Sequence, residues 1–580
     1  MFDIIIAGGK IIDGTGEKEY IADIGIKDGI ITFIGNLDGK ESSEIIKATG
    51  RVVTPGFIDM HSHGDITLPR YPGMESALLQ GITTILGGNC GLSIAPCDEW
   101  WTAQWFEYEQ LEELSGNNLS TPDVVKTQDI SPLMKRDYGF DICWRSFEEY
   151  LEYINALGIG GNYIPMVGHG AIRAQVLGLD YKRAANNLEI EQMKEHLRDA
   201  MLAGAVGLST GLDYAPGIYA DFQELKALCG VVAECGGIYD PHWRKTGLRE
   251  GPTKKQKKID GIIEALELGL QTGAQVHLAH LSCGFEVYPG GDSYMEAASA
   301  RRTLQIIDEY RKKGVKVTYD VIPNVTAGLE LEADFCLRFL PWLKNCGSCE
   351  VFAEKLKTSD YRLLIAKEIN SGNYYPINAA NNPDWAAAYT ILQHNNAEYV
   401  GCNLAKLAER KKQNPLETAF DLLAEDPYTK TFMVIHGMTT ASIREFISDP
   451  NATIGTDSFV FDENGIISVG KGLPPYYPSP NTFSGMIKYL CEFAQKSFAE
   501  TIKKITGKSA EILRLKDRGI IAEGKKADIV VLNNETLATN ENHIDPRVWP
   551  TGIEYVLVNG KIAVQDGKYT GTRSGTVVTM

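Results

Sequence analysis

The chain lacks an excess of basic residues. Of its 580 residues, 57 are lysine or arginine and 75 are aspartate or glutamate, which gives a formal net charge of −18. Proteins that bind nucleic acid carry basic surfaces, so this balance argues against such a partner. The hydrophobic content of 44% is ordinary for a large enzyme.

Long apolar runs are missing as well. No run of 18 apolar residues occurs, so we expect no membrane span. The first residues have no basic start and only a short apolar run, which predicts that no secretory signal is present. The 11 cysteines are odd in number and scattered, as is typical of a reducing compartment. We therefore expect a cytoplasmic protein.

Short strand-like runs stand at both ends of the chain. Four such runs, separated by Gly/Asp turns, lie before residue 55, and three more lie beyond residue 515. Short strands bounded by turn residues need a partner layer to bury their apolar faces. The sequence therefore predicts one small β-sandwich built from residues 1–55 and 515–580.

Between these ends, apolar runs alternate with helical patterns. Near-continuous apolar runs of this length are typical of parallel strands that are buried on both faces. The alternation predicts the α/β class and a (β/α)8 TIM-type barrel over 56–328 and 449–514. Helices are predicted at 184–203, 222–235, 255–271 and 295–313. The eight strand runs are 56–63, 83–87, 163–168, 204–209, 237–242, 275–280, 315–320 and 452–457.

Two connections are too long for simple β-α units. Residues 329–448 are rich in helix formers and are predicted to form an inserted subdomain. Within them, Cys346 and Cys349 lack further ligands for a structural zinc and are interpreted as surface thiols. The other connection, 96–160, forms either a lid over the barrel mouth or packing on its outside. It carries the aromatic residues Trp100, Trp101, Trp105 and Phe106.

Metal-ligating residue types gather at the ends of the predicted strands, where barrel enzymes carry their chemistry. His61 and His63 alternate along one strand, so both side chains point the same way. Of the 10 histidines in the chain, five stand at such ends. This convergence favours a metal site over separate polar core residues. In chain order the residues are His61, His63, Cys90, His169, His242, His280 and Asp457.

Three of these positions have alternative interpretations. Cys90, in Gly-Gly-Asn-Cys-Gly, is a soft zinc ligand as a thiolate and otherwise a small buried hydrophobe. Asp457 would act as a general base that takes up a proton and passes it to the leaving group; the alternative is a helix N-cap. Strand alternation turns only one of His277 and His280 inward, and we choose His280 as the ligand because it lies nearer the strand end.

Several longer motifs extend this pattern. They are Pro-Gly-Phe-Ile-Asp-Met-His-Ser-His at 55–63, Gly-Asn-Cys-Gly at 88–91, Val-Gly-His-Gly-Ala-Ile-Arg at 167–173, Tyr-Asp-Pro-His-Trp-Arg at 239–244 and Ile-Gly-Thr-Asp at 454–457. On these motifs the chain resembles the amidohydrolase superfamily. The closest branch is that of the N-acyl-D-amino-acid deacylases, or D-aminoacylases, and the likeness runs nearly from end to end.

The resemblance implies zinc as the cofactor, with one tight site and a second, weaker site. Cys90, His242 and His280 match the ligands of the tight site. His61, His63 and Asp457 match those of the second site, and Cys90 is able to bridge the two. Many members of the superfamily bridge with a carbamylated lysine on the fourth strand. The fourth run here has no lysine, and a cysteine supplies the same single negative charge.

The chain departs from the family pattern where the substrate is expected to bind. Ser282 stands where a lysine is common, and Asn324 where a tyrosine is common. Arg173 and Arg244 remain as candidate anion binders, and with His169 these residues make up the predicted substrate contacts. Fewer cationic partners make a buried carboxylate costly. We therefore predict weak activity on ordinary N-acetyl-D-amino acids and better activity on a neutral or larger group, with the aromatic cluster as an apolar surface for it.

Taken together, the motifs predict a zinc-dependent hydrolase that cleaves an amide C–N bond in a small molecule, nearest to an N-acyl-D-amino acid. A cyclic amide, ester or lactone hydrolase with the same site is the second interpretation. A non-catalytic scaffold on the same fold is the third. The sequence leaves the oligomeric state open, a homo-oligomer included.

Overall fold

The computed structural model describes residues 1–579 except 105, 117–121, 246–257, 288–289, 327–329, 332, 373, 378–383 and 435–436. Two sequence-based expectations, Trp105 and the start of the helix predicted at 255–271, therefore lie outside the described residues. Among the described helices, none combines the length and the apolar character that crossing a membrane requires.

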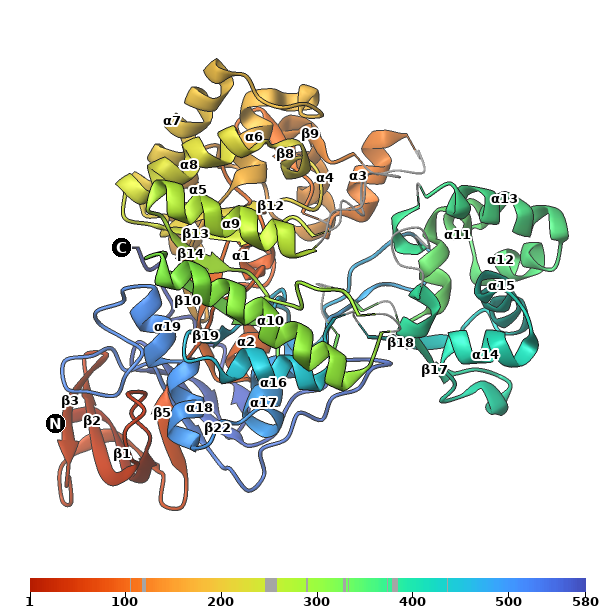
Figure 1. The fold of residues 1–580 in the computed structure, drawn as a ribbon. Coiled ribbons are helices and arrows are strands. Elements are labelled where there is room, and N and C mark those ends of the chain that lie inside the picture. Colours follow the sequence, from red (N-terminus) through yellow and green to blue (C-terminus); the bar gives the residue numbers. More distant parts are fainter. Residues whose placement is uncertain are drawn as a thin grey trace.

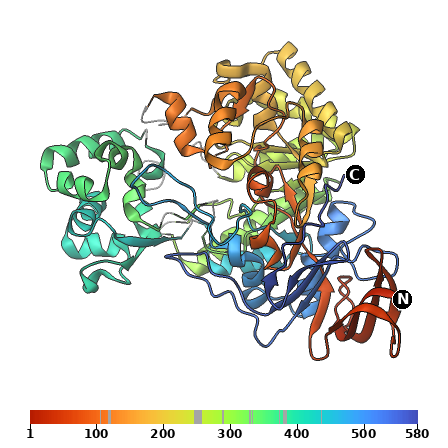
Figure 2. The same cartoon turned by 180° about the vertical axis from the view of Figure 1, so that it is seen from behind.

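Strands from both ends of the chain join in one sheet (Figures 1 and 2). Its described strands are β1 (Phe2–Ile11), β2 (Tyr20–Lys27), β3 (Ile30–Gly35), β4 (Ser42–Lys47), β5 (Val52–Pro55), β21 (Ile529–Leu532), β22 (Ile553–Val558), β23 (Lys561–Gln565) and β24 (Lys568–Tyr569). The two halves meet where β5 pairs antiparallel with β21. Isoleucine and valine side chains of both halves, such as Ile6, Ile24, Ile529 and Val531, form its buried core.

Two short strands predicted near the N-terminus form the single strand β1. Its pairing with β2 shifts register between Ile6 and Gly9, and Gly8 there adopts φ +70°. A glycine with positive φ at a bulge lets the strand continue past the irregularity. The Gly-Gly pair therefore marks a bulge rather than a turn.

The barrel is present, and all eight predicted runs supply its strands. The described strands are β6 (Phe57–Asp59), β7 (Ile82–Gly87), β10 (Asn162–Pro165) continued by β11 (Val167–Gly168), β12 (Gly207–Gly211), β13 (Ile238–His242), β14 (Gln275–Leu278), β15 (Val317–Val321) and β19 (Ala452–Ile454). Every pairing between them is parallel. The backbone N–H of Met60 donates to Ile454 O at 3.2 Å and that of Asp457 to His61 O at 2.8 Å, which closes the ring between β19 and β6.

The four predicted barrel helices are present with nearly the expected bounds. They are α7 (Asn187–Ala203), α8 (Phe222–Glu234), α9 (Lys258–Thr272) and α10 (Ser293–Lys312). Side-chain caps explain where three of them begin. Asn186, Asp221 and Asp292 each accept a backbone N–H of the first turn of α7, α8 and α10.

The first long connection packs beside the barrel helices. It holds β8 (Trp100–Thr102), α3 (Tyr108–Ser115), β9 (Val124–Lys126) and α4 (Thr127–Tyr138), and α5 (Phe147–Leu157) follows. β8 lies against α6 (His169–Leu177). The segment also reaches other parts of the chain, because Glu112 pairs with Lys344 at 2.6 Å and Glu109 accepts a hydrogen bond from Ser468 at 2.8 Å.

The second long connection forms a helical body that stands apart from the barrel in both views (Figures 1 and 2). It contains α11 (Leu340–Cys346), α12 (Cys349–Leu356), α13 (Ser359–Asn370), α14 (Leu404–Lys411), α15 (Pro415–Glu425) and the antiparallel pair β17 (Tyr389–Gln393) and β18 (Lys430–Met433). By contrast α16 (Thr440–Ser448), inside the predicted insertion, packs on α10. The domain boundaries themselves stay predictions.

One expectation about this insertion is wrong. Cys349 is not a surface thiol: it is buried, and its sulfur lies 3.7 Å from that of Cys336. Cys346 is partly buried, and its sulfur lies 3.3 Å from the Tyr361 hydroxyl. Because Cys349 begins α12 and Cys346 ends α11, the short turn between them points the two thiols in different directions.

Candidate metal centre

The ends of the barrel strands bring six side chains together at one mouth of the barrel. His61 and His63 follow β6, and His242 is the last residue of β13. Cys90, His280 and Asp457 lie in turns with left-handed backbones, at φ 57°, 32° and 50°. Such backbones are costly for these residue types and gather at functional sites, where surrounding packing holds them.

Glycines on both sides of Cys90 make its turn feasible. A Cβ on Gly88 would lie 2.0 Å from Met166 O, and one on Gly91 would lie 2.4 Å from the backbone nitrogen of Gly211. Both distances are far below a normal contact, so only glycine fits. The Gly-Asn-Cys-Gly motif therefore presses the backbone against neighbouring strands and projects the thiol into the barrel mouth.

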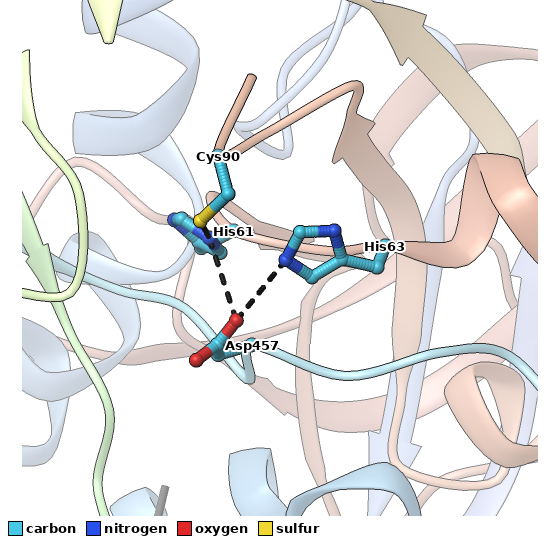
Figure 3. A group of neighbouring side chains, drawn as sticks. All are labelled: His61, His63, Cys90 and Asp457. Atoms are coloured by element: carbon cyan, nitrogen blue, oxygen red, sulfur yellow. Dashed lines mark hydrogen bonds and ion pairs between the residues drawn. The ribbon is translucent and has the colours of Figure 1, made fainter. Parts of the chain in front are cut away.

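The Cys90 sulfur is the centre of the cluster. It lies 3.2 Å from His61 Nε2, 3.4 Å from His242 Nδ1 and 3.3 Å from His280 Nε2. Asp457 Oδ1 lies 3.2 Å from His63 Nε2 and 3.5 Å from His61 Nε2 (Figure 3). Two donor groups result, Cys90 with His242 and His280, and Cys90 with His61, His63 and Asp457, each with its donor atoms within 4.8 Å of one another.

This donor set fits zinc. Nitrogen and sulfur ligands at about 2.0–2.3 Å in a tetrahedron are separated from one another by about 3.3–3.8 Å. The separations of 3.2, 3.3 and 3.4 Å from the Cys90 sulfur lie at or just below the short end of that range. All six residues are buried, so thiolate, imidazole and carboxylate would otherwise crowd together without water. A cation at their centre removes that cost.

Charges in the cluster favour the metal-binding form of Cys90, and burial and charge together favour that of His242. Although burial raises the pKa of the Cys90 thiol, the imidazoles of His61, His280 and His242 hold it well below its usual range. Burial and, next, the Lys245 ammonium lower the pKa of His242 to about 3, so its ring is neutral. Thiolate and neutral imidazole are the forms that bind zinc.

The second donor group is held ionised as well. Burial raises the pKa of Asp457, but the hydrogen bond from His63 and the charge of His61 bring it to about 2. Against burial, which lowers it, Asp457 and Cys90 raise the pKa of His63 to about 9. The anions of the cluster thus demand positive charge, which a proton or a metal ion can supply.

Asp320 holds two of the ligand candidates, His61 and His280, in position. This role was not predicted from the sequence. Its Oδ2 lies 3.3 Å from His61 Nδ1 and 3.4 Å from His277 Nε2, and its Oδ1 accepts the backbone N–H of His280 at 2.9 Å. A carboxylate behind a ligating imidazole fixes the tautomer and raises its basicity. The sequence signal that could have identified Asp320 is its position, because it ends a predicted strand as the ligand candidates do. His277, turned toward Asp320 and Thr318, stands outside both donor groups.

Comparison with known proteins supports the resemblance to amidohydrolases. A family model described as the amidohydrolase family matches residues 44–131 and 484–564. D-aminoacylase of Alcaligenes xylosoxydans xylosoxydans is 26% identical over 582 residues, covering 100% of this chain and 97% of that protein. The chain is therefore similar to amidohydrolases over its whole length. The N-acyl-D-glutamate deacylase of the same organism is 27% identical over 566 residues, covering 96% of this chain and 93% of that protein.

Solved structures bear out the fold of the chain. A crystal structure of D-aminoacylase superimposes with a TM-score of 0.69 at 24% identity and covers 100% of both chains. The N-acyl-D-glutamate deacylase of Bordetella bronchiseptica, in a complex with zinc and a phosphonate inhibitor, gives a TM-score of 0.68 at 24% identity and likewise covers 100% of both chains. The predicted (β/α)8 barrel is thus confirmed.

The arginines predicted to bind substrate already contact other groups of the protein. Arg173 is fully buried and pairs with Glu224, whose other oxygen lies 2.7 Å from His169 Nε2. Arg244 contacts Glu264 at 3.2 Å and donates to two backbone carbonyls of the 218–220 loop. This placement does not favour either arginine, or His169, as a substrate contact.

The other predicted substrate residues lie at different places. Ser282 is buried two residues beyond His280. The Asn324 side chain donates to Asn481 Oδ1 at 3.0 Å and to Glu541 Oε1 at 2.7 Å, which makes it part of a polar network with the C-terminal segment. Neither belongs to the donor groups of the metal centre.

The aromatic cluster offers no open apolar surface among the described residues. Trp101 and Phe106 are buried, and the Trp101 indole donates to Glu107 at 2.8 Å. Trp100 packs against Gly178, where an added Cβ would lie 2.8 Å from its ring. Of the two alternatives for the 96–160 connection, these contacts favour packing over an apolar lid.

Proposed function

We propose that this protein is a zinc-dependent hydrolase that cleaves an amide C–N bond in a small molecule. The observation that carries the proposal is the buried Cys90 sulfur between two donor groups, one of which holds the Asp457 carboxylate. Its relatives D-aminoacylase, N-acyl-D-glutamate deacylase and N-acyl-D-aspartate deacylase support N-acyl-D-amino acids as the substrate class.

Cys90, His242 and His280 would hold the tightly bound zinc. His61, His63 and Asp457 would hold a weaker second ion, with Cys90 shared between the sites. Bound zinc would polarise the substrate carbonyl and favour ionisation of water at the site. For D-aminoacylase, a binuclear centre with one-metal activation and second-metal attenuation is described, which supports one working ion here as well.

Asp457 is the residue we assign to proton transfer. It is ionised, because its pKa lies at about 2, and its side chain is 11% exposed, against 0% for His61 and 1% for His63. It can therefore take a proton from the attacking water at its carboxylate and donate it to the leaving nitrogen. His63, hydrogen-bonded to the same oxygen, holds that carboxylate in place.

Two other functions fit parts of the arrangement. A cyclic amide, ester or lactone hydrolase would use the same residues and differ only in the substrate. A non-catalytic scaffold would have no reason to keep a buried thiolate, three or more imidazoles and a carboxylate in contact, since such clusters cost stability. We also propose that the protein acts in the cytoplasm, in keeping with its 11 free cysteines.

Zinc content and turnover of the purified protein test the proposal. We expect about one tightly bound zinc per chain and hydrolysis of at least one compound among N-acyl D- and L-amino acids, lactones and cyclic imides. Asp457→Asn should lower kcat by ~10²–10⁴-fold, because an amide cannot carry the proton, while the tightly bound zinc stays.

Asp462→Asn is the matched control, since it changes an aspartate five residues away that only accepts a turn hydrogen bond from Asn464 at 2.8 Å. It should retain activity. A protein that binds no zinc, or an Asp457→Asn variant with normal kcat, would contradict the assignment. Turnover of lactones or cyclic imides alone would favour the second function.

A further inference from the structure

A substrate carboxylate needs a cation close to the metal centre. In an N-acyl amino acid, the carboxylate carbon is three bonds from the carbonyl carbon that is attacked, so within about 4 Å of it. Ser282 stands where the resemblance predicts a lysine, and Arg173 and Arg244 are engaged elsewhere. A different cation must serve if the substrate is anionic.

Lys245 lies beyond the end of the strand that carries a metal-ligand candidate. It follows the ligand His242 by three residues, beyond the end of β13. Its ammonium lies 5.3 Å from the centre of the Trp243 ring. Burial lowers the pKa of Lys245, while the negative charges of Asp213, Cys90 and Asp457 act to raise it. Its ammonium therefore lies within the electrostatic reach of both donor groups of the metal centre.

Among the described residues, Lys245 has neither a hydrogen bond nor an ion pair. Trp243 gives it only a ring contact, and the side chain is partly buried. A partly buried ammonium keeps only part of its hydration. Binding of an anionic group at this position would replace the part that is lost.

Lys258 adds positive potential but has acids of its own. It is the first described residue of α9, and a Cβ on Gly261 of the same helix would lie 1.8 Å from Arg244 O, so this end of α9 presses on the segment that carries Lys245. Burial lowers the pKa of Lys258, and Glu286 acts against it. Lys258 in turn lowers the pKa of Lys245.

We propose that Lys245 binds the carboxylate of the substrate and makes the free acid the preferred form over a neutral analogue. The proposal rests on the hydrolase function proposed above. It reverses the sequence-based prediction of a preference for neutral substrates, which considered the departures at Ser282 and Asn324 and the two arginines but not Lys245. Lys245 is thus a specificity-determining residue that takes over the role of the missing family lysine from the end of a different strand.

The test is the ratio of kcat/KM for an N-acetyl-D-amino acid to kcat/KM for its carboxamide. The amino acid is the one that the zinc-loaded wild-type protein hydrolyses best among methionine, glutamate and aspartate. We expect a ratio above about 10, because a charge-assisted hydrogen bond has that effect or more. Lys245→Met should lower the ratio at least tenfold, mainly through KM for the acid. Lys245→Arg should restore most of it.

Lys258→Met is the matched control, because it removes a neighbouring ammonium that has its own acids. It should change the ratio by less than about threefold, since it acts only through the potential at Lys245. A wild-type ratio near 1, or a ratio that Lys245→Met leaves unchanged, overturns the inference alone. Failure of the wild-type protein to hydrolyse either compound overturns the proposed function and the inference with it. Zinc content, measured in every variant, separates these outcomes from a lost metal.

Discussion

At the scale of single residues, the site depends on backbone conformations that few residues tolerate. Cys90, His280 and Asp457 all have positive φ, which costs on the order of 1–3 kcal/mol each and is held only by surrounding packing. Gly88 and Gly91 allow the close approach on which the Cys90 turn depends. The position of the thiol is therefore set before any metal binds, which lowers the cost of assembling the site.

The role of Cys90 leads to a prediction about zinc. Cys90→Ala removes the only atom shared by both donor groups, so we expect the zinc content to fall well below one per chain, as measured by elemental analysis of purified protein. Cys229→Ala is the control, because that cysteine is buried in α8 and belongs to neither donor group. Full zinc content in Cys90→Ala would refute the ligand assignment.

The part of the site that could be predicted from the sequence is the set of residues at the ends of predicted strands. Residue type and strand-end position bring His61, Cys90 and Asp457 together in the prediction, and the structure places them in contact. The position of a residue in the sequence does not show which partner the end of a long side chain contacts. Arg173 and Arg244 were predicted to face the substrate, yet they bind Glu224 and Glu264, which lie 51 and 20 residues away in the chain.

At the scale of elements, the strands are better predicted than the connections. Apolar runs buried on both faces identify all eight barrel strands, because that environment leaves little choice of residue. The Cys346 and Cys349 pair shows the opposite case. Their sequence spacing says nothing about Cys336, which lies in η3 (Phe335–Phe339) and whose sulfur is 3.7 Å from that of Cys349 at the start of α12.

A buried ionic cluster ties α6 to α8. Glu224, in the first turn of α8, binds His169 and Arg173 of α6, and all three side chains are buried. Burial raises the pKa of Glu224, but His169 and Arg173 bring it to about 2, below its ordinary value of 4.5. Because the folded-state pKa is depressed, the stabilisation is fully present above about pH 4.5 and is lost as the pH falls toward 2.

We therefore predict that Glu224→Gln destabilises the protein by about 3–5 kcal/mol at pH 7.5, since it leaves a buried arginine without its partner. The difference from wild type should narrow below pH 4.5. Urea unfolding at pH 7.5, 5.0 and 3.5 measures it. Glu234→Gln is the control on the same helix, because its exposed pair with Arg198, at 3.2 Å, contributes at most about 1 kcal/mol. A difference in the free energy of unfolding between wild type and Glu224→Gln that grows as the pH falls would contradict the argument.

At the scale of the whole molecule, parts of the chain that are far apart in the sequence form shared structure. The sheet joins residues near both termini, and the last residues then run on to the barrel. The backbone N–H of Gly575 donates to Ile159 O at 2.8 Å, that of Tyr163 to Thr576 O at 3.0 Å, and that of Val578 to Tyr163 O at 2.8 Å. The tail thus pairs beside the start of β10, at the end of the barrel opposite the metal centre.

Because the tail contacts and the metal centre lie at opposite ends of the barrel, we expect a change in the tail to lower stability without affecting metal binding. Gly575→Ala tests this expectation. A Cβ on Gly575 would lie 1.9 Å from Gly161 O, a backbone atom that cannot move aside, so the tail must detach. Losing its hydrogen bonds should cost about 2–4 kcal/mol at 0.5–1.5 kcal/mol each and lower the urea midpoint. Zinc content should stay unchanged, because the donor groups lie at the other end of the strands. Thr579→Ala, at an exposed position beyond the paired residues, should alter neither quantity. An unchanged midpoint in Gly575→Ala would mean that the tail contributes no stability, and a loss of zinc would mean that the two ends of the barrel are coupled.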